Sequence, residues 1–300
     1  ITASALVTVV DKRVPASYIK AGVYDPTDAL YGATGLGTGN DAPAIQAAID
    51  AVCGPGGLTQ HGGARAKMVV PNGVYRTEAM LSVPAACFAE ISGENVKGTY
   101  IYQQVGTGAA LRINGSICTN CGNVAPRTSS NNDGAVYLHD ISLGSTVGHG
   151  LSLLNAYETL VERVHIFSAD VASNFIDLDG VSTFLGNDLR TNGNADYPAE
   201  WISTALANRE QPLRGIYITS RAVAGSYNVS GQITLNRPRI EGQQTSHAIE
   251  IALDAAADFT IYPVIINDPD LIILNTTAGI LVDKAIVIVN GGYCERQSGT

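Results

Sequence analysis

Residues 31–51 read YGATGLGTGNDAPAIQAAIDA, and residues 68–81 read MVVPNGVYRTEAML. A Gly-rich turn opens onto Asn40 and Asp41, either of which can cap a helix whose first turn holds Pro43. The apolar residues that follow recur at helical spacing, which predicts a short amphipathic helix near 41–52. Extended structure is expected after this helix, closing on the Pro-Asn-Gly turn at 71–73.

The order of these elements resembles the entrance of the pectate-lyase-like right-handed β-helix family, which includes many bacteriophage tailspikes. The family pattern has a Gly-Ala-x-Gly-Asp-Gly run, paired Asp residues, a helix ending Gln-Ala-Ala-Ile-Asp, and then Pro-x-Gly-x-Tyr. Here Leu36 stands where the family often has Asp, and Asn40 replaces the first of the paired Asp residues. The resemblance covers residues 31–75. It implies an all-β fold, a right-handed parallel β-helix that forms a single-stranded solenoid with the helix plugging its first coil.

The composition excludes several classes of protein. The chain has 300 residues with 32 Gly, and 15% of its residues are charged, which suits short strands and turns better than helices. A formal net charge of −9 argues against nucleic acid and against anionic membrane surfaces as partners. No run of 18 apolar residues occurs, so no membrane insertion is expected. The start, ITASALVTVVDKRV, lacks an initiator Met and a signal-peptide layout, so we expect a trimmed or processed chain.

The cysteines point to no particular chemistry. Cys118 and Cys121 form one CxxC pair, and no second pair follows at zinc-ribbon spacing. Spacing leaves free thiols, a local disulfide and a metal site open, and incidental free thiols are the main expectation. We therefore expect no metal and no cofactor.

A weak repeat runs through the second half of the chain, with steps of 23, 23, 49, 31 and 23 residues. Its anchors are Ile141, Val164, Asn187, Asn236, Asn267 and Asn290. Three residues before each anchor stand Leu138, Val161, Phe184, Ile233, Val264 and Val287. This apolar column predicts strand positions that face the interior of a solenoid. We therefore expect a lead-in over residues 1–30, a β-helix domain over 31–300 and an insertion near 191–214.

Equal offsets from the anchors predict stacked neighbours about 4.8 Å apart. One offset gives a column of Asp188, Arg237 and Asp268, and another gives a column of Arg190, Arg239 and Asp270. If these side chains point outward, they form two ladders of alternating charge. Such ladders are either surface ion pairs, each contributing about 0–1 kcal/mol, or a polar floor for a long carbohydrate.

The insertion carries the only Trp of the chain, Trp201, with Asp196, Tyr197 and Glu200 close to it. Carbohydrate sites need aromatic faces for sugar rings and carboxylates for acid, base or nucleophile work. A loop that projects from a rigid coil is a usual place for such residues. The alternative is a helix that Asp196 caps and that packs Trp201 onto the β-helix wall.

Two further pairs carry weaker signals. Asp177 and Asp179 in NFIDLDG alternate on a strand and share one face, about 6.5–7 Å apart, which is within the range for paired catalytic carboxylates. Asp179 can equally be a turn residue beside Gly180. His165 beside Asp188 on the next coil can form an orienting pair for general-base catalysis.

The resemblance implies a tailspike-like protein of the phage tail, outside the cell, that binds and hydrolyses a bacterial surface polysaccharide. The predicted catalytic residues are Asp188, Asp196, Glu200 and Asp268, and the predicted substrate-binding residues are Trp201, Tyr197, His165, Arg190, Arg237 and Arg239. Elimination would instead use His165 as the base and the arginines to neutralise a uronic acid. The acidic chain makes a strongly anionic substrate less favourable, so hydrolysis is the prediction.

The alternative is a non-catalytic receptor-binding or structural virion protein with the same fold. The resemblance also implies a homotrimer, and residues 1–30 are expected to contact other virion tail proteins. A cellular pectate-lyase-type enzyme is disfavoured because its calcium-binding Asp cluster is not evident. Carboxylates that converge in a groove would favour the enzyme, and carboxylates paired singly with Arg would favour the binding protein.

Overall fold

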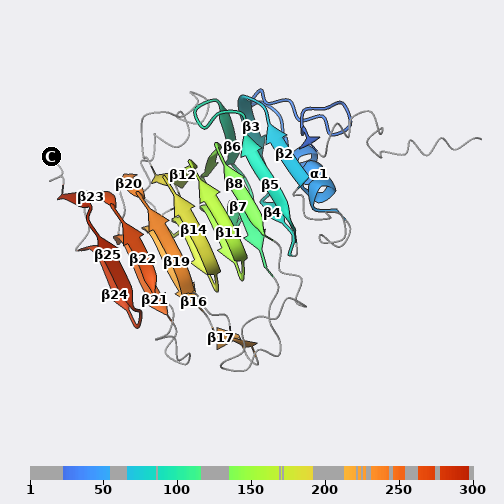
Figure 1. Ribbon diagram of the computed structural model, residues 1–300. Coiled ribbons are helices and arrows are strands. Elements are labelled where there is room, and N and C mark those ends of the chain that lie inside the picture. The colour runs from blue at the N-terminus through green and yellow to red at the C-terminus, as the bar shows by residue number, and fades with distance from the viewer. Residues whose placement is uncertain are drawn as a thin grey trace, which may run out of the picture.

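The computed structural model describes residues 23–54, 66–85, 87–115, 135–168, 170, 172–191, 213–220, 222–223, 226–227, 231–242, 246–253, 263–273 and 278–296. Its strands form three long parallel sheets, here called A, B and C, and successive coils add strands to A, B and C in turn (Figure 1). The protein is a right-handed parallel β-helix, so the predicted fold class is confirmed.

Sheet A consists of β1 (Val23–Tyr24), β2 (Ala66–Val70), β5 (Ala89–Gly93), β8 (Val136–His139), β11 (Tyr157–Glu162), β14 (Ser182–Asn187), β19 (Gly231–Asn236), β22 (Val264–Asn267) and β25 (Val287–Asn290). Sheet B consists of β3 (Gly73–Thr77), β6 (Thr99–Gln103), β9 (Ser142–Ser145), β12 (His165–Ser168), β15 (Arg190–Thr191), β20 (Arg239–Gly242), β23 (Asp270–Ile273) and β26 (Tyr293–Arg296). Sheet C consists of β4 (Leu81–Val83), β7 (Ala109–Asn114), β10 (His149–Leu154), β13 (Asn174–Asp179), β16 (Arg214–Ser220), β21 (His247–Leu253) and β24 (Ala278–Asp283). A short antiparallel pair, β17 (Ala222–Val223) and β18 (Ser226–Tyr227), stands apart from these sheets.

The core lies inside the coil and is built by alternation along each strand. On β13, Ile176 and Leu178 are fully buried, and each pairs in register with an aliphatic residue on both neighbouring strands. Burying such a side chain contributes roughly 1.5–3 kcal/mol. Because successive side chains point to opposite faces, the residues between them project from the outer surface of the sheet.

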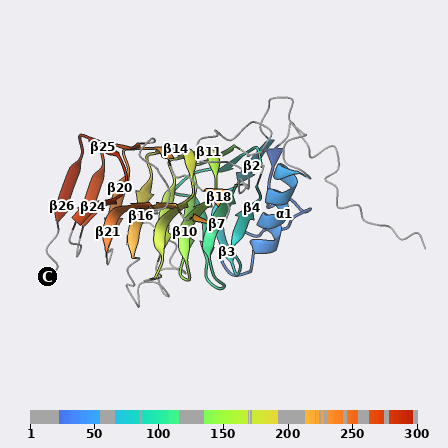
Figure 2. The same cartoon turned by 90° about the horizontal axis from the view of Figure 1, so that it is seen from below.

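A single helix, α1 (Ala42–Cys53), covers the first coil and confirms the predicted capping helix. Figures 1 and 2 both place it against the end formed by β2 and β4. Of the two candidate caps, Asn40 provides the acceptor, because its Oδ1 receives the N–H groups of Ala42 and Glu78 at 3.1 Å. The carboxylate of Asp41 turns back to the N–H of Thr34 at 2.7 Å.

The Pro-Asn-Gly turn and the Gly-rich loop meet around Tyr75. This side chain is fully buried, and its hydroxyl donates to the carbonyl of Pro71 at 3.0 Å. A Cβ on Gly35, whose φ is +63°, would lie 3.1 Å from the Tyr75 ring. The two quoted stretches are therefore one packed unit, which explains why glycine and tyrosine occur together in the motif.

A disulfide joins Cys53, at the end of α1, to Cys87, which precedes β5, across a sequence separation of 34. The main expectation, incidental free thiols, is wrong for this pair. Spacing could not reveal it, because the fold alone brings the end of the helix to the second coil. Cys294 is a free, exposed cysteine, and Cys118 and Cys121 lie outside the described residues.

The bend from sheet A to sheet B uses a left-handed residue in successive coils, with φ between 47° and 66°. These residues are Asp140, Arg163, Asp188, Arg237, Asp268 and Gly291. Before four of them stand Asn187, Asn236, Asn267 and Asn290, which pair in register. Each Asn Nδ2 donates to the Oδ1 of the preceding Asn at 2.7–2.8 Å. The asparagine ladder therefore fixes the bend at the same position in these four coils.

The predicted repeat is confirmed for these four asparagine anchors and is wrong by two residues for the first two. Asn187 pairs in register with Glu162, and Glu162 pairs with His139. The residues that match the asparagines are therefore Glu162 and His139, and the predicted anchors Val164 and Ile141 lie two residues after them. A shift of two residues keeps every side chain on the same face of a strand. The apolar column is therefore buried as predicted up to Val264, although it mixes two neighbouring columns.

Candidate functional site

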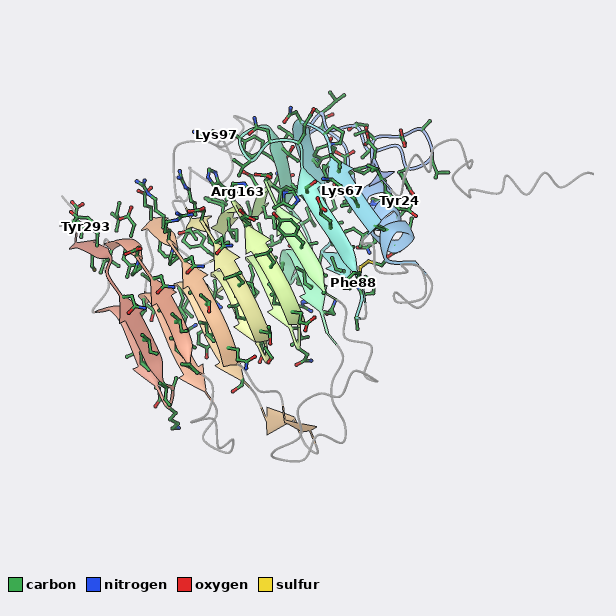
Figure 3. The ribbon with its side chains drawn as sticks, viewed as in Figure 1. Tyr24, Lys67, Phe88, Lys97, Arg163 and Tyr293 are labelled. Atoms are coloured by element: carbon green, nitrogen blue, oxygen red, sulfur yellow. A yellow bond between two sulfur atoms is a disulfide. The ribbon has the colours of Figure 1, made fainter. Side chains whose placement is uncertain are left out.

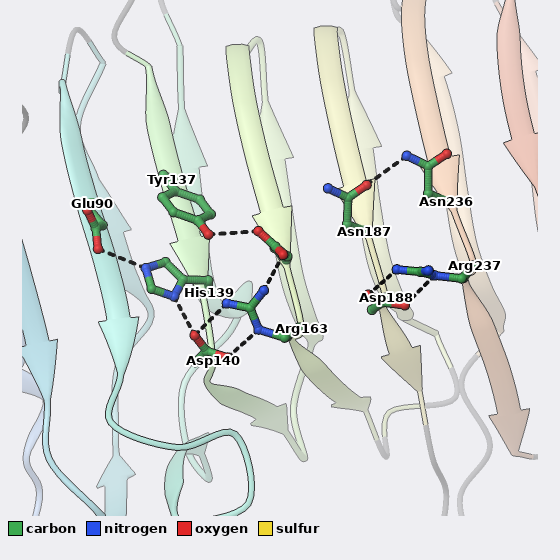
Figure 4. Close-up of polar contacts among 10 residues, drawn as sticks. Glu90, Tyr137, His139, Asp140, Arg163, Asn187, Asp188, Asn236 and Arg237 are labelled. Carbon is green, nitrogen blue, oxygen red and sulfur yellow. Dashed lines mark hydrogen bonds and ion pairs between the residues drawn. The ribbon is translucent and has the colours of Figure 1, made fainter.

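The six left-handed residues at the bend are here called the corner ladder, and four of them form two ion pairs between neighbouring coils. Arg163 donates from Nε and Nη2 to the two carboxylate oxygens of Asp140 at 2.7 and 2.8 Å. Arg237 makes the same two-point contact with Asp188 at 2.8 Å for both bonds (Figure 4). Figure 3 shows Arg163 near the bend between sheets A and B. The contact between Arg237 and Asp188 confirms the predicted pairing of these two residues.

A polar network continues from the corner ladder across the outer face of sheet A. The ring of His139 lies between two carboxylates, with Nδ1 at 2.7 Å from Asp140 Oδ2 and Nε2 at 3.0 Å from Glu90 Oε1. Lys67 donates to the same Glu90 oxygen at 2.7 Å. The His139 ring also stacks on Tyr137 at 4.2 Å between centroids. The network links four consecutive coils.

The acids of this network are held in their ionised form. The hydrogen bond from Arg163 lowers the pKa of Asp140 to about 2, with burial opposing and His139 adding to the effect. Burial alone would raise the pKa of Glu90, but hydrogen bonds from Lys67 and His139 lower it overall. A carboxylate that cannot take up a proton near neutral pH cannot act as a general acid. The arrangement favours stabilisation of the stacked coils.

Two predicted catalytic acids, Asp188 and Asp268, belong to the corner ladder. Arg237 donates to both carboxylate oxygens of Asp188, and this hydrogen bond to Asp188 raises the pKa of Arg237. Asp268 follows in the next coil and adds a smaller electrostatic contribution to Arg237. Their predicted catalytic roles stay predictions, because no contact in the structure tests them.

The second predicted ladder lies on sheet B. Arg190 pairs in register with Arg239, and Arg239 pairs with Asp270, whose carboxylate is 3.5 Å from the guanidinium. Arg239 also donates to Glu241 on its own strand. The residue beside Arg190 on the preceding coil is His165. The predicted pairing of His165 with Asp188 is therefore wrong, because the coil that ends in β14 is two residues longer than the repeat.

Four predicted residues of the insertion, Asp196, Tyr197, Glu200 and Trp201, lie outside the described residues. Their predicted catalytic and sugar-binding roles stay predictions.

The outer face of sheet C gathers another set of polar side chains, which we call the sheet C face. Its members come from four adjacent strands and are His149 and Ser152 on β10, Asn174, Asp177 and Asp179 on β13, Arg214 and Tyr217 on β16, and Glu250 on β21. In-register pairing aligns Ser152, Asp177, Tyr217 and Glu250 in one row across the sheet. The fold thus brings together residues up to 98 positions apart in the chain.

Asp177 and Asp179 are the two carboxylates of β13 on this face. The strand alternation places them on the same side, with Cα atoms about 6.5–7 Å apart. Asn174 donates from Nδ2 to Asp177 Oδ1 at 2.9 Å. Asp179 is only 8% exposed, whereas Asp177 is half-buried. Two carboxyl groups on one face and in unlike surroundings fit the division into acid and base that glycoside hydrolysis requires.

Beside Asp177 lies an aromatic and cationic group. The guanidinium of Arg214 lies over the Tyr217 ring, 4.1 Å from its centroid. Its Nε donates to Glu250 Oε2 at 2.5 Å and its Nη2 donates to Oε1 at 3.1 Å. Glu250, 8% exposed, is thereby neutralised by a partner rather than available for proton transfer. The group offers a rigid aromatic surface next to the paired carboxylates.

The sequence predicts Asp177 and Asp179 only as secondary candidates, and sequence analysis did not identify Asn174, Arg214, Tyr217 or Glu250. The alternation within RGIYITS and HAIEIAL predicts that Tyr217 and Glu250 face outward. Asn174 and Arg214 stand in the same phase as the buried Ile176 and Ile216, so alternation could not identify them. Alternation shows which residues face outward, but it cannot show which outer faces become neighbours when loops of different length separate the strands.

Among the described residues, no group of three or more His, Cys, Asp or Glu side chains is arranged to hold a metal ion. Within the same residues, no helix is long and apolar enough to cross a membrane.

No protein-family model matches the chain, and no curated protein matches it. Solved structures with similarity include a protein of Geobacillus virus E2, ORF18, at 13% identity and a TM-score of 0.39. The match covers 94% of this chain, and the chain spans 62% of the length of the virus protein.

Two further similar structures come from bacteria. PfbA, a surface adhesin of Streptococcus pneumoniae, matches at 13% identity and a TM-score of 0.40, over 91% of this chain and 74% of the adhesin. The catalytic unit of a GH87 α-1,3-glucanase from Streptomyces thermodiastaticus matches at 14% identity and a TM-score of 0.29, over 93% of this chain and 69% of that unit.

Proposed function

We propose that this chain binds a bacterial cell-surface polysaccharide on the sheet C face and hydrolyses it there. The observation that carries the proposal is the pair Asp177 and Asp179, which stand two residues apart on β13 and share one face of that strand. Tyr217 lies in register beside Asp177, and the face of its ring opposite Arg214 is proposed to receive a sugar ring. A shallow face along parallel strands also suits a long, linear ligand.

The chemistry follows from the surroundings of the two acids. Asp179, the more buried carboxyl, donates its proton to the glycosidic oxygen as the bond to the anomeric carbon breaks. Asp177, held by Asn174, takes a proton from a water molecule whose oxygen attacks that carbon from the opposite side. Inversion requires the two carboxyl groups to lie roughly 6.5–9.5 Å apart, so that this water fits between the acid and the base.

This proposal moves the reaction away from Asp188 and Asp268, since Arg237 already engages Asp188. The sequence-based roles of Asp196, Glu200, Tyr197 and Trp201 remain part of the proposal. They belong to the segment that joins β15 of sheet B to β16 of sheet C. Arg190, Arg237, Arg239 and His165 are proposed to contact the polysaccharide outside the reacting sugars.

A second candidate function is a non-catalytic, receptor-binding or structural virion protein. The observation that favours it is the corner ladder, where carboxylates are paired singly with arginine along several coils. In either case we propose a tailspike-like, extracellular role in a phage tail, as a homotrimer that contacts other tail proteins through residues 1–30.

The test is to incubate the purified chain with a panel of bacterial capsular and O-antigen polysaccharides. Fragment size and the ultraviolet absorbance of unsaturated sugars are followed together. Shorter fragments without new absorbance are expected. Fragments with rising absorbance would instead indicate elimination, and binding to a polysaccharide without fragments would support the non-catalytic candidate.

A further inference from the structure

Behind Asp177 lies a chain of two hydrogen bonds that starts on the neighbouring coil. His149 opens β10, and its Nδ1 lies 2.9 Å from the backbone nitrogen of Asn174, which opens β13. Asn174 in turn donates from its side-chain Nδ2 to Asp177 Oδ1 at 2.9 Å. One residue thus connects the imidazole to the carboxylate.

The first bond defines the state of the imidazole. A backbone N–H can only donate, so Nδ1 of His149 must be the acceptor and cannot carry a proton. The ring is therefore neutral, with its proton on Nε2. Protonation of Nδ1 would place two N–H groups against each other and break the contact with Asn174.

The second bond defines the orientation of the Asn174 amide. The residue is 3% exposed, and its Oδ1 is buried without a hydrogen-bond partner. Leaving a buried acceptor without a partner costs roughly 1–3 kcal/mol. The observed orientation accepts this cost at Oδ1 and uses Nδ2 to contact Asp177. The reverse orientation would place Oδ1 against the carboxylate of Asp177. The arrangement favours the carboxylate at the expense of the amide.

Few charged side chains lie on the elements packed around these two hydrogen bonds. The elements packed against β10 are β7, β9, β12 and β13. Their titratable or charged side chains are Arg112 on β7, His165 on β12, and Asp177 and Asp179 on β13, while β9 has none. Asp170 lies in the segment before β13, and Arg214 pairs in register with Asn174.

We propose that His149 and Asn174 are positioning residues, which hold Asp177 in the rotamer and charge state it needs as the base. This inference rests on the proposed function, in which Asp177 reacts with water. His149 acts through Asn174 and does not touch the sugar.

The first experiment needs no substrate. Protection of the Asn174 amide against hydrogen exchange, normalised to its intrinsic rate, is measured by NMR in the wild type and in two variants at position 149. His149→Asn keeps an acceptor oxygen close to the position of Nδ1, whereas His149→Ala has no acceptor. Protection is expected in the wild type and in His149→Asn and is expected to be lost in His149→Ala. Equal protection in all three proteins would overturn the inference.

The second experiment uses the polysaccharide that the panel identifies as cleaved. His149→Ala is expected to lower kcat about 3- to 10-fold, the effect of one neutral hydrogen bond, with little change in KM. Asn174→Ala removes a bond to a charged group and is expected to lower kcat about 10- to 100-fold. His149→Asn should recover kcat relative to His149→Ala, because it restores the acceptor for the Asn174 amide.

The outcomes separate the inference from the proposed function. If Asp177→Asn is inactive while both His149→Ala and Asn174→Ala match the wild type, the positioning inference fails and the proposed function stands. If Asp177→Asn is fully active, the proposed function fails, and the exchange experiment alone decides whether the hydrogen bond between His149 and Asn174 exists.

Discussion

Asp140→Asn removes the charge at one position of the corner ladder with little change in shape. Asp140 has a φ of 55°, and Asn accepts this left-handed conformation as readily as Asp does. The variant loses the charged partner of Arg163, which contacts both carboxylate oxygens at 2.7 and 2.8 Å. It also places an uncharged group against His139. The expected result is a less stable protein at neutral pH.

The magnitude follows from the pKa of Asp140, which the hydrogen bond from Arg163 lowers from 3.8 to about 2. At about 1.36 kcal/mol per pH unit, this difference corresponds to about 2.4 kcal/mol. The carboxylate is 29% exposed, so solvent screening reduces the expected contribution to about 1–2 kcal/mol. Because the pKa is lowered by folding, this stability is present above about pH 4 and is lost as the pH falls toward about 2.

The assay is urea unfolding followed by circular dichroism, for the wild type and Asp140→Asn, at about pH 7 and at about pH 2. The matched control is Asp268→Asn, which has the same left-handed backbone and forms no ion pair among the described residues. The difference for Asp140→Asn should be present at neutral pH and largely absent at the acid pH. An equal difference at both pH values, or an equal effect of Asp268→Asn, would refute the reasoning.

Three further predictions concern the ladder, the disulfide and the sugar surface. Asn236→Ala removes two side-chain hydrogen bonds of the asparagine ladder, to Asn187 and Asn267, and should lower the free energy of unfolding by about 1–3 kcal/mol; no change in the urea midpoint would argue against a stabilising ladder. Replacing Cys53 and Cys87 with Ser opens a link across 34 residues and should cost about 3–4 kcal/mol, with the thermal midpoint as the readout and Cys294→Ser as the control. Tyr217→Ala should raise KM for the cleaved polysaccharide by about 2- to 12-fold, as expected for loss of stacking worth roughly 0.5–1.5 kcal/mol, whereas an unchanged KM would remove Tyr217 from the binding surface.

The fold could be predicted because its signals are local. The spacing of apolar residues in α1, the Pro-Asn-Gly turn and the recurring asparagines each act over a few residues. The same asparagines locate the bends correctly, because each stands directly before a left-handed residue and pairs in register with the asparagine of the neighbouring coil. The first two anchors were wrong by two residues because a two-residue shift preserves the pattern of buried side chains, and one coil is longer than the repeat.

The candidate site could be predicted only in part, because it depends on neighbours that are distant in sequence. Asp177 and Asp179 were recognisable as a pair on one strand. Their neighbours Tyr217 and Glu250 come from later coils, and loops of different length set which residues meet. The ion pair between Asp188 and Arg237 was correctly predicted as a contact. Arg237 contacts both oxygens of the Asp188 carboxylate. Sequence spacing cannot predict this geometry, because it depends on side-chain orientation.

The most direct test of the central claim compares cleavage of the same polysaccharide by the wild type, Asp177→Asn, Asp179→Asn and the control Asp283→Asn. Asp283 stands in the same row of sheet C as Asp179, but its side chain is 60% exposed at the end of the β-helix. The account predicts that Asp177→Asn and Asp179→Asn bind the polysaccharide and cleave it about 10²- to 10⁴-fold more slowly, while Asp283→Asn matches the wild type. Cleavage at the wild-type rate by both β13 variants would contradict a catalytic site on sheet C.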